Sequence, residues 1–352
     1  MTQPESTATL DEALTRLHTT GPEHLGRLSN HAPMAVEALV RHGQAAEVHH
    51  WLNSYRDKLE EMPAAGNIRV DEGNWRAFLG DPRHLADWIG HFGRCLEERP
   101  WREVLAQWWP RLLPGILGGA THPVIRVGHA VRTLLADGEA APRTAELAQA
   151  LGYWAARHLP PAAPVTLSGT RDPARALAAV PAVPSRRGSV LDRVSQLPAT
   201  PGWPAAVSAP RPPRGPEDAR ELLTELVCAA VCRYAERAHG EPVMLVHAAT
   251  APNAVLRTLP ALPRELWVPG YTAAWLSSAA VTAAYAPDGP LPSAAPAPGT
   301  AEEAFERAAA HGDEHVIKLA DTALDVAAAA PERAGTALAA VARACELVER
   351  PA

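Results

Sequence analysis

Proline is the residue that most constrains how this chain can fold. Of its 352 residues, 35 are proline, and the sequence between them is rich in alanine, leucine and arginine, which favour helix. Proline breaks a helix interior but is tolerated in the first turn, so the pattern predicts many short helices. The sequence has neither an alternating strand pattern of useful length nor a repeat of fixed period. We therefore expect an all-α fold, a large multi-helix array that forms a single domain over residues 1–352.

Apolar residues at helical spacing place most of the expected helices. These are predicted over residues 9–17, 45–59, 82–98, 101–113, 143–158, 217–238, 264–285, 301–329 with a break near Gly312, and 332–348. Residues 160–216 are the most proline-rich part of the chain. This stretch is either an interdomain linker or a segment that covers a pocket, and we favour the covering segment. An alanine- and proline-rich run at 286–299 looks disordered.

Charge and hydropathy argue against two classes of partner. The formal net charge is −6, the isoelectric point is near 6.2, and lysine is scarce among the 33 basic residues. No basic face suited to phosphate backbones is expected, so nucleic acid is an unsuitable partner. Apolar stretches end well before the ~20 residues that a bilayer crossing needs, so no membrane association is expected. The polar, acidic start of the chain does not resemble a signal peptide, which favours the cytoplasm.

The cysteines fit a reducing compartment. The chain has four, none in a CxxC pair: Cys95, Cys228, Cys232 and Cys345. Cys228 and Cys232 stand four residues apart in a predicted helix, where two thiolates on one face can bind a metal. Free cysteine is often a small buried hydrophobe, and we favour that interpretation.

Two histidines stand at predicted helix starts. Ser29 or Asn30 is a candidate helix cap before His31, and Thr121 is a candidate cap before His122. Both histidines, like His247, are followed by a small residue or proline, so that backbone can approach the imidazole closely. These contexts look buried, which makes the three histidines candidate site residues.

Lys318 is an unusual residue for its surroundings. It follows His315 by three residues on one helical face, among the apolar Val316, Ile317 and Leu319. A buried ammonium is costly unless it is neutralised or paired.

Two interpretations of Lys318 follow. An ion pair with Asp321 or Asp325 is the simpler one, and spacing alone favours it. In the other, a neutral amine captures carbon dioxide as a carbamate and becomes an oxygen ligand for a metal.

A second metal pattern overlaps the first. His311, Glu314 and His315 satisfy H-x-x-E-H, in which two histidines hold zinc and the glutamate activates water. Gly312 disfavours the continuous helix that this motif needs. No G-x-S-x-G, P-loop or strand-following G-x-G-x-x-G occurs, which argues against common hydrolase and nucleotide-binding folds.

Aromatic residues also have two interpretations. Trp101, Trp108 and Trp109 belong to one predicted helix, and Trp267, Tyr271 and Trp275 line one face of another. Core packing is the default for both sets, although a flat aromatic substrate would suit such a surface.

Four segments resemble, in order, the successive motifs of the questin oxidase-like family. They are Ser29–Leu39 (SNHAPMAVEAL), Gly119–His129 (GATHPVIRVGH), His247–Leu256 (HAATAPNAVL) and His315–Ala320 (HVIKLA). Each motif is short, but together they span most of the chain.

The resemblance implies an α-helical enzyme of secondary metabolism that opens the ring of an anthraquinone or a related aromatic polyketide or quinone with molecular oxygen. The ring opening is a carbon–carbon cleavage, either Baeyer–Villiger-like or by a dioxygenase. NADPH is implied as an external reductant for some members, and this sequence has no recognisable site for it.

The resemblance also implies non-haem Fe(II) bound by four histidines and a carboxylated lysine. By motif these are His31, His122, His247, His315 and Lys318, with His315 and Lys318 also acting in catalysis. The CO2-derived carbamate on Lys318 becomes the better interpretation, because it supplies the anionic oxygen that imidazoles lack. One coordination position must stay open for oxygen or substrate.

The chain departs from the family pattern in one motif. The family often has a further histidine where this chain has Arg126, and His129 takes a tyrosine-like position. Since His122 is retained, we expect the metal site to persist and the substrate contacts there to differ. Asn30, Glu37 and Asp321 are candidates for orienting the histidines.

Three hypotheses follow. The first is the iron-dependent oxygenase. The second is a zinc hydrolase that uses His311, Glu314 and His315. The third is a non-catalytic helical binding protein whose histidines are satisfied core residues.

Overall fold

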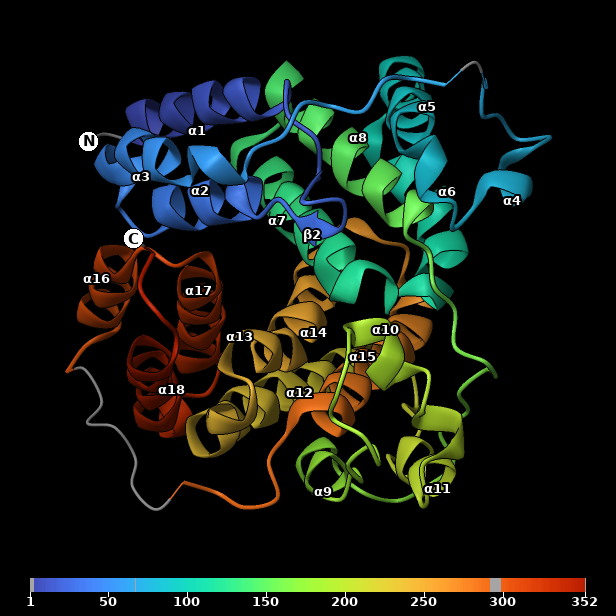
Figure 1. The fold of residues 1–352 in the computed structure, drawn as a ribbon, viewed down its shortest axis with the longest axis vertical. Helices are drawn as coiled ribbons and strands as arrows, with labels where there is room; N and C mark the ends of the chain where they lie inside the picture. The colour runs from blue at the N-terminus through green and yellow to red at the C-terminus, as the bar shows by residue number, and fades with distance from the viewer. Residues whose placement is uncertain (1–2, 67, 292–298, 352) are drawn as a thin grey trace. The chain divides into compact units, whose positions relative to one another are not determined.

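The computed structural model describes residues 3–66, 68–291 and 299–351, and nearly all of its regular structure is helical (Figure 1). The predicted all-α class is confirmed. The exception in the described chain is a two-stranded antiparallel sheet, in which β1 (Glu23–His24) pairs with β2 (Leu28–Ser29). Contacts divide the chain into two compact units. Unit 1 is Met1–Pro161 with Arg257–Pro263, and unit 2 is Ala162–Leu256 with Arg264–Ala352. The single-domain expectation stays a prediction.

Unit 1 is built from short helices joined by 3-10 turns. Besides the sheet it contains α1 (Gln3–Leu17), α2 (Ala32–Arg41), η1 (Ala45–Glu47), α3 (Val48–Tyr55), η2 (Arg56–Lys58), α4 (Trp75–Phe78), η3 (Pro82–His84), α5 (Leu85–Glu98), α6 (Trp101–Leu112), η4 (Leu113–Gly115), η5 (Gly118–Thr121), α7 (His122–Asp137), α8 (Ala141–Ala156) and η8 (Leu259–Ala261).

Unit 2 has the same character. It contains α9 (Pro173–Ala178), α10 (Val190–Val194), η6 (Leu197–Ala199), α11 (Trp203–Val207), α12 (Pro216–Arg237), η7 (Ala238–Gly240), α13 (Pro242–Leu245), α14 (His247–Thr258), which runs into unit 1, η9 (Arg264–Leu266), α15 (Trp267–Tyr285), α16 (Ala301–His311), α17 (Glu314–Ala329), η10 (Pro331–Arg333) and α18 (Ala334–Leu347).

The core of unit 1 forms where α8 packs on α5 and α7. Gly152 lets α5 and α8 approach closely, because a Cβ there would lie 2.8 Å from the backbone nitrogen of Ile89. Trp108 is fully buried and makes T-shaped contacts with both Trp88 and Phe92. The core interpretation of this tryptophan is therefore confirmed.

The core of unit 2 centres on α15, whose residues from Ala274 to Tyr285 are all buried. Helices α12, α9 and α10 pack against it. Trp275 is fully buried and its indole N–H donates to the Val207 carbonyl at 2.8 Å, which confirms a structural role for this residue. The three C-terminal helices α16, α17 and α18 pack against one another (Figure 1).

The proline-rich stretch is part of unit 2. Residues after Pro161 form α9, α10, η6 and α11; α9 contacts α12 and α15, and α10 contacts α15. Short helices with proline in the first turn suit this composition. Of the alanine- and proline-rich run at 286–299, residues 292–298 lie outside the described residues.

Several local predictions can be checked directly. The break near Gly312 is confirmed, because α16 ends at His311 and Gly312 takes a left-handed φ of 87°. The cap predicted at Thr121 is wrong, because its side chain makes no cap hydrogen bond. The core interpretation of Cys228 and Cys232 is wrong too, since both are only half-buried. Within the described residues no helix has the length and apolarity needed to span a bilayer.

Candidate functional site

The structure places the five predicted ligands in two groups, one in each unit. His31 and His122 belong to unit 1, and His247, His315 and Lys318 belong to unit 2. All five side chains are buried. Each group is described within its own unit.

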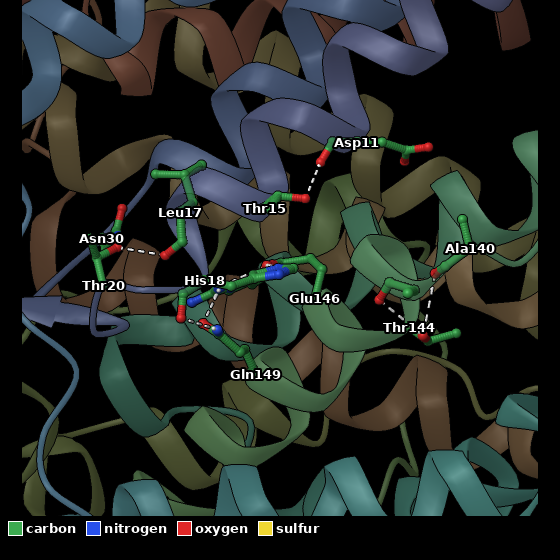
Figure 2. Close-up of polar contacts among 12 residues, drawn as sticks. Asp11, Thr15, Leu17, His18, Thr20, Asn30, Ala140, Thr144, Glu146 and Gln149 are labelled. Atoms are coloured by element: carbon green, nitrogen blue, oxygen red, sulfur yellow. Dashed lines mark hydrogen bonds and ion pairs between the residues drawn. The ribbon is translucent and has the colours of Figure 1, made fainter.

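His31 is held at the start of α2 by the residue before it. The Asn30 side-chain oxygen accepts from the Ala32 backbone N–H at 3.0 Å, and its amide donates to the Gly21 carbonyl at 3.0 Å. The same amide donates to the Thr20 hydroxyl at 3.3 Å, and Figure 2 shows Asn30 beside Thr20. The His31 backbone N–H donates to the Tyr55 hydroxyl at 2.9 Å. Asn30 therefore fixes the backbone that carries His31, which supports its predicted orienting role.

His122 opens α7 directly after a strained turn. Gly119, Ala120 and Thr121 have φ values of 53°, 54° and 69°, in the left-handed region. The left-handed conformation is unfavourable by roughly 1–2 kcal/mol for a residue that has a Cβ, and a β-branched threonine rarely adopts it. Such strain is often stored next to functional side chains. Here it places the Gly119 carbonyl 2.7 Å from His122 Nδ1.

The histidine pair of unit 1 is close-packed. The rings of His31 and His122 stack with centroids 4.5 Å apart and planes 18° from parallel. Because a carbonyl can only accept, Nδ1 of His122 carries the proton, and a neutral ring then has its lone pair on Nε2. That tautomer is the one in which an imidazole binds a metal through Nε2.

His247 of unit 2 has the same arrangement. It is the first residue of α14, and its Nδ1 donates to the Met244 carbonyl at 3.0 Å. Burial, Lys318 and His315 together lower the pKa of His247 well below its ordinary value, so its ring is neutral. The rings of His247 and His315 lie 5.8 Å apart between centroids.

The start of α17 positions His315. Asp313 caps this helix, accepting from the backbone N–H groups of His315 at 2.8 Å and Val316 at 3.2 Å. Its carboxylate also lies 3.4 Å from His315 Nδ1. Donor atoms of Asp313, Glu314 and His315 come within 4.8 Å of one another, so carboxylates surround this histidine.

Lys318 lies one turn further along α17 and is fully buried. Its Nζ has no hydrogen-bond partner in the described part of the chain, and the ion pair considered with Asp321 or Asp325 is not formed there. Burial lowers the pKa of Lys318 from 10.5 to about 8, although Glu314 and Asp313 act in the opposite direction. An amine in this state is readily deprotonated, as carbamate formation requires.

His311 does not join either group as a ligand. It ends α16, whereas Glu314 and His315 begin the next helix. Its Nε2 bonds to the Val348 carbonyl at 3.1 Å, and its Nδ1 accepts from the Asp313 backbone N–H at 3.4 Å. Both ring nitrogens are thus engaged with backbone, which argues against the H-x-x-E-H zinc site.

Two buried ion clusters in unit 1 were only partly visible in the sequence. In the first, Glu37 pairs with Arg132 and lies 2.7 Å from His129 Nδ1. Burial alone would raise the pKa of Glu37, but Arg132 and His129 lower it to about 2. Within unit 1, Glu37 therefore orients His129, not the predicted ligands His31 and His122.

The second cluster centres on Glu146, which accepts from the Arg126 guanidinium at 2.5 and 2.7 Å. The His18 ring also lies 3.3 Å from the Glu146 carboxylate (Figure 2). Arg126 also reaches Gln149 at 3.1 Å. Arg126, where the chain departs from the family pattern, thus forms a buried ion pair with Glu146, while its Nη1 has no hydrogen-bond partner among the described residues.

A sequence signal for both clusters existed. Arg126, His129 and Arg132 recur every three residues in an otherwise apolar helix, which marks one polar stripe.

No curated protein matches the chain. One family model, described as questin oxidase-like, matches residues 28–197. The matched region contains His31 and His122, whereas His247, His315 and Lys318 lie beyond it. Over residues 28–197, a little under half of its length, the chain is similar to the questin oxidase-like family.

Proposed function

We propose that this protein is a non-haem iron oxygenase that cleaves a carbon–carbon bond of an anthraquinone or related aromatic polyketide with molecular oxygen. The match of residues 28–197 to the questin oxidase-like family model supports the oxygenase class. The observation that carries the metal proposal is Lys318, a fully buried amine one turn after His315, with no hydrogen-bond partner in the described chain.

The proposed ligands are His31, His122, His247, His315 and carboxylated Lys318. Their chemistry fits Fe(II), because neutral imidazole and an anionic oxygen are both ligands that iron accepts. His122 and His247 each have Nδ1 fixed by a backbone carbonyl, at 2.7 and 3.0 Å. Such contacts fix ring orientation and tautomer in metal sites.

Carbamate formation is the step that this chain's own residues prepare. The neutral Nζ of Lys318 attacks carbon dioxide, a C–N bond forms, and one proton leaves to solvent or a nearby base. The cation becomes an anion, which a divalent metal can neutralise. Without the metal, an anionic carbamate would be as costly to bury as any unpaired charge.

Bound iron supplies the one-electron chemistry that lets molecular oxygen react with a closed-shell aromatic ring. The protein contributes position and protection. Asp313 holds the backbone of His315, Asn30 holds the turn before His31, and buried surroundings exclude water from reactive species.

Oxygen stoichiometry tests whether the proposed reaction needs an external reductant. Insertion of one oxygen atom reduces the other to water and consumes two electrons, which NADPH would supply. Dioxygenase cleavage needs no external reductant. Oxygen uptake with hydroxylated anthraquinones, with and without NADPH, separates the two reactions.

The functional test compares histidine variants in the same assay. His31→Ala and His247→Ala are expected to abolish oxygen uptake and iron binding. His311→Ala is the matched control and should keep both, because its ring bonds to backbone. The zinc-hydrolase alternative predicts the reverse pattern. A protein that binds quinones without consuming oxygen in any form would contradict the proposal.

A further inference from the structure

Two of the cysteines form a pair on the longest helix of unit 2. Cys228 and Cys232 stand one turn apart on α12 and are both half-buried and reduced. On α12, the neighbouring Val227 and Val231 are buried, whereas Glu225 and Glu236 are exposed. The cysteine pair therefore lies at the boundary between the buried and the exposed face of this helix. A small reagent can therefore reach both sulfurs.

The two thiols interact with each other. A hydrogen bond from Cys232 lowers the pKa of Cys228 to about 7, and Arg333 acts in the same direction. The same contact raises the pKa of Cys232. Near neutral pH the pair is therefore one thiolate beside one thiol. A thiolate is the form of cysteine that binds metals and attacks electrophiles.

Helix geometry decides what such a pair can hold. Cβ atoms four residues apart on a helix are ~5–6 Å from each other, whereas a disulfide needs about 3.5–4.5 Å. A direct S–S bond would therefore distort α12. An atom placed between the sulfurs has no such requirement, since two metal–sulfur bonds of ~2.3 Å reach across this gap.

Space beside the pair suits a small third ligand. A cavity of about 20 Å³ is lined by Cys228, Asn253 and Asp325 together with apolar side chains of α12, α14 and α17. This is about the volume that one water molecule occupies. Asn253 is buried and donates to Asp325 at 3.0 Å, while its side-chain oxygen has no partner in the described chain. The surface that faces the cavity is nevertheless apolar, so the cavity offers space beside Cys228 but no polar contact.

We propose that Cys228 and Cys232 form a two-sulfur binding site for a soft, thiophilic ion of low coordination number, the class that includes monovalent copper and trivalent arsenic. Thiolates select such ions over hard cations. The site is independent of the histidine groups and of the proposed oxygenase activity.

Phenylarsine oxide tests the bridging geometry, because it binds tightly only where two thiols can reach one arsenic. Two As–S bonds form, the oxygen leaves as water with both thiol protons, and no atom changes oxidation state. Reduced protein is treated with one equivalent, challenged with excess glutathione, and weighed by native mass spectrometry. We expect one arsenical per chain, released about 100-fold more slowly than from a single thiol, because both bonds must open together.

Variants locate the site. Cys228→Ser and Cys232→Ser should each lose arsenical retention, while the double variant Cys95→Ser/Cys345→Ser should retain it as the wild type does. Circular dichroism and iron content should be unchanged in all of them, and Cys228→Ala and Cys232→Ala repeat the test should a serine variant misfold. Equal retention in Cys228→Ser and wild type would overturn the proposal.

Preloading tests the ion class. One equivalent of Cu(I) should protect both thiols from the arsenical in the wild type. Failure to protect would contradict binding of a soft metal ion. Ready formation of a Cys228–Cys232 disulfide by oxidised glutathione would contradict the geometric argument.

Discussion

The imidazole of His122 stacks on that of His31 directly after a turn in which three consecutive residues adopt left-handed φ angles. The turn and the stack are related, because the Gly119 carbonyl that fixes His122 Nδ1 comes from within the turn. Backbone strain in unit 1 therefore holds one histidine against the other.

Thr121→Gly tests whether the backbone strain of this turn serves to position His122. Glycine removes the left-handed cost and a buried hydroxyl that has no partner in the described chain. We expect the free energy of unfolding to rise by about 1 kcal/mol, after allowing for the entropy of glycine in the unfolded chain. Iron affinity should fall, because His122 loses its fixed position. Denaturant unfolding and metal titration measure the two effects.

Thr133→Gly is the matched control for this variant. Thr133 is buried inside α7 with helical geometry and its hydroxyl donates to the His129 carbonyl at 3.1 Å, so glycine there should destabilise the protein by about 1–3 kcal/mol through backbone entropy and lost buried contacts. Destabilisation of Thr121→Gly to the same extent would show that the turn stores no strain.

Glu37→Gln tests the first ion cluster of unit 1. Removing the carboxylate leaves Arg132 as a buried, uncompensated cation, which typically costs about 3–5 kcal/mol. Glu12→Gln is the control, because Glu12 is exposed and only meets His49 at 3.6 Å. Its effect should stay below about 1 kcal/mol. Equal effects of the two variants in urea unfolding would contradict a buried pair.

Glu146 gives a prediction for pH dependence. Burial opposes ionisation, but Arg126 and His18 lower the pKa of Glu146 from 4.5 to about 2. A carboxyl whose folded pKa is depressed stabilises the fold above its unfolded pKa and loses this stabilisation as pH falls through the folded pKa. The stability difference between wild type and Glu146→Gln should therefore be constant above about pH 5 and shrink steadily toward pH 2. A difference that does not change with pH would contradict the assigned ionisation.

How far the sequence predicts the fold depends on which interactions are local. Proline spacing and helix periodicity gave the all-α class, and Gly312 gave the break between α16 and α17. The cap at Thr121 failed because its left-handed φ of 69° is imposed by the turn around it, which residue preferences do not reveal.

The candidate site shows the same limit. Helix-start positions nominated His31 and His122 as candidates, and the alanine that follows His247 nominated the third, because all of these signals are local in the sequence. The ion pair that spacing alone favoured for Lys318 is absent from the described chain, because a helical spacing does not say which side chains turn toward each other. Glu146 was missed because its partners Arg126 and His18 come from distant parts of unit 1.

Lys318→Met tests two points: how much the buried amine destabilises the metal-free fold, and whether it forms a carbamate. Methionine is of similar length and apolar, so the metal-free variant should be more stable than metal-free wild type, by about 1–3 kcal/mol. A less stable variant would mean that Nζ has a stabilising partner. In the wild type, 13C-labelled bicarbonate should add one carbamate carbon signal in NMR spectra that Lys318→Met lacks. Lys58, the other lysine of the chain, serves as the control in Lys58→Met.

The most direct measurement is the metal content of anaerobically purified protein, wild type beside Lys318→Ala and Lys58→Ala. The account predicts near-stoichiometric iron in the wild type and in Lys58→Ala, and its loss in Lys318→Ala. Zinc retained in all three proteins, or no metal in any of them, would contradict an iron site that depends on Lys318.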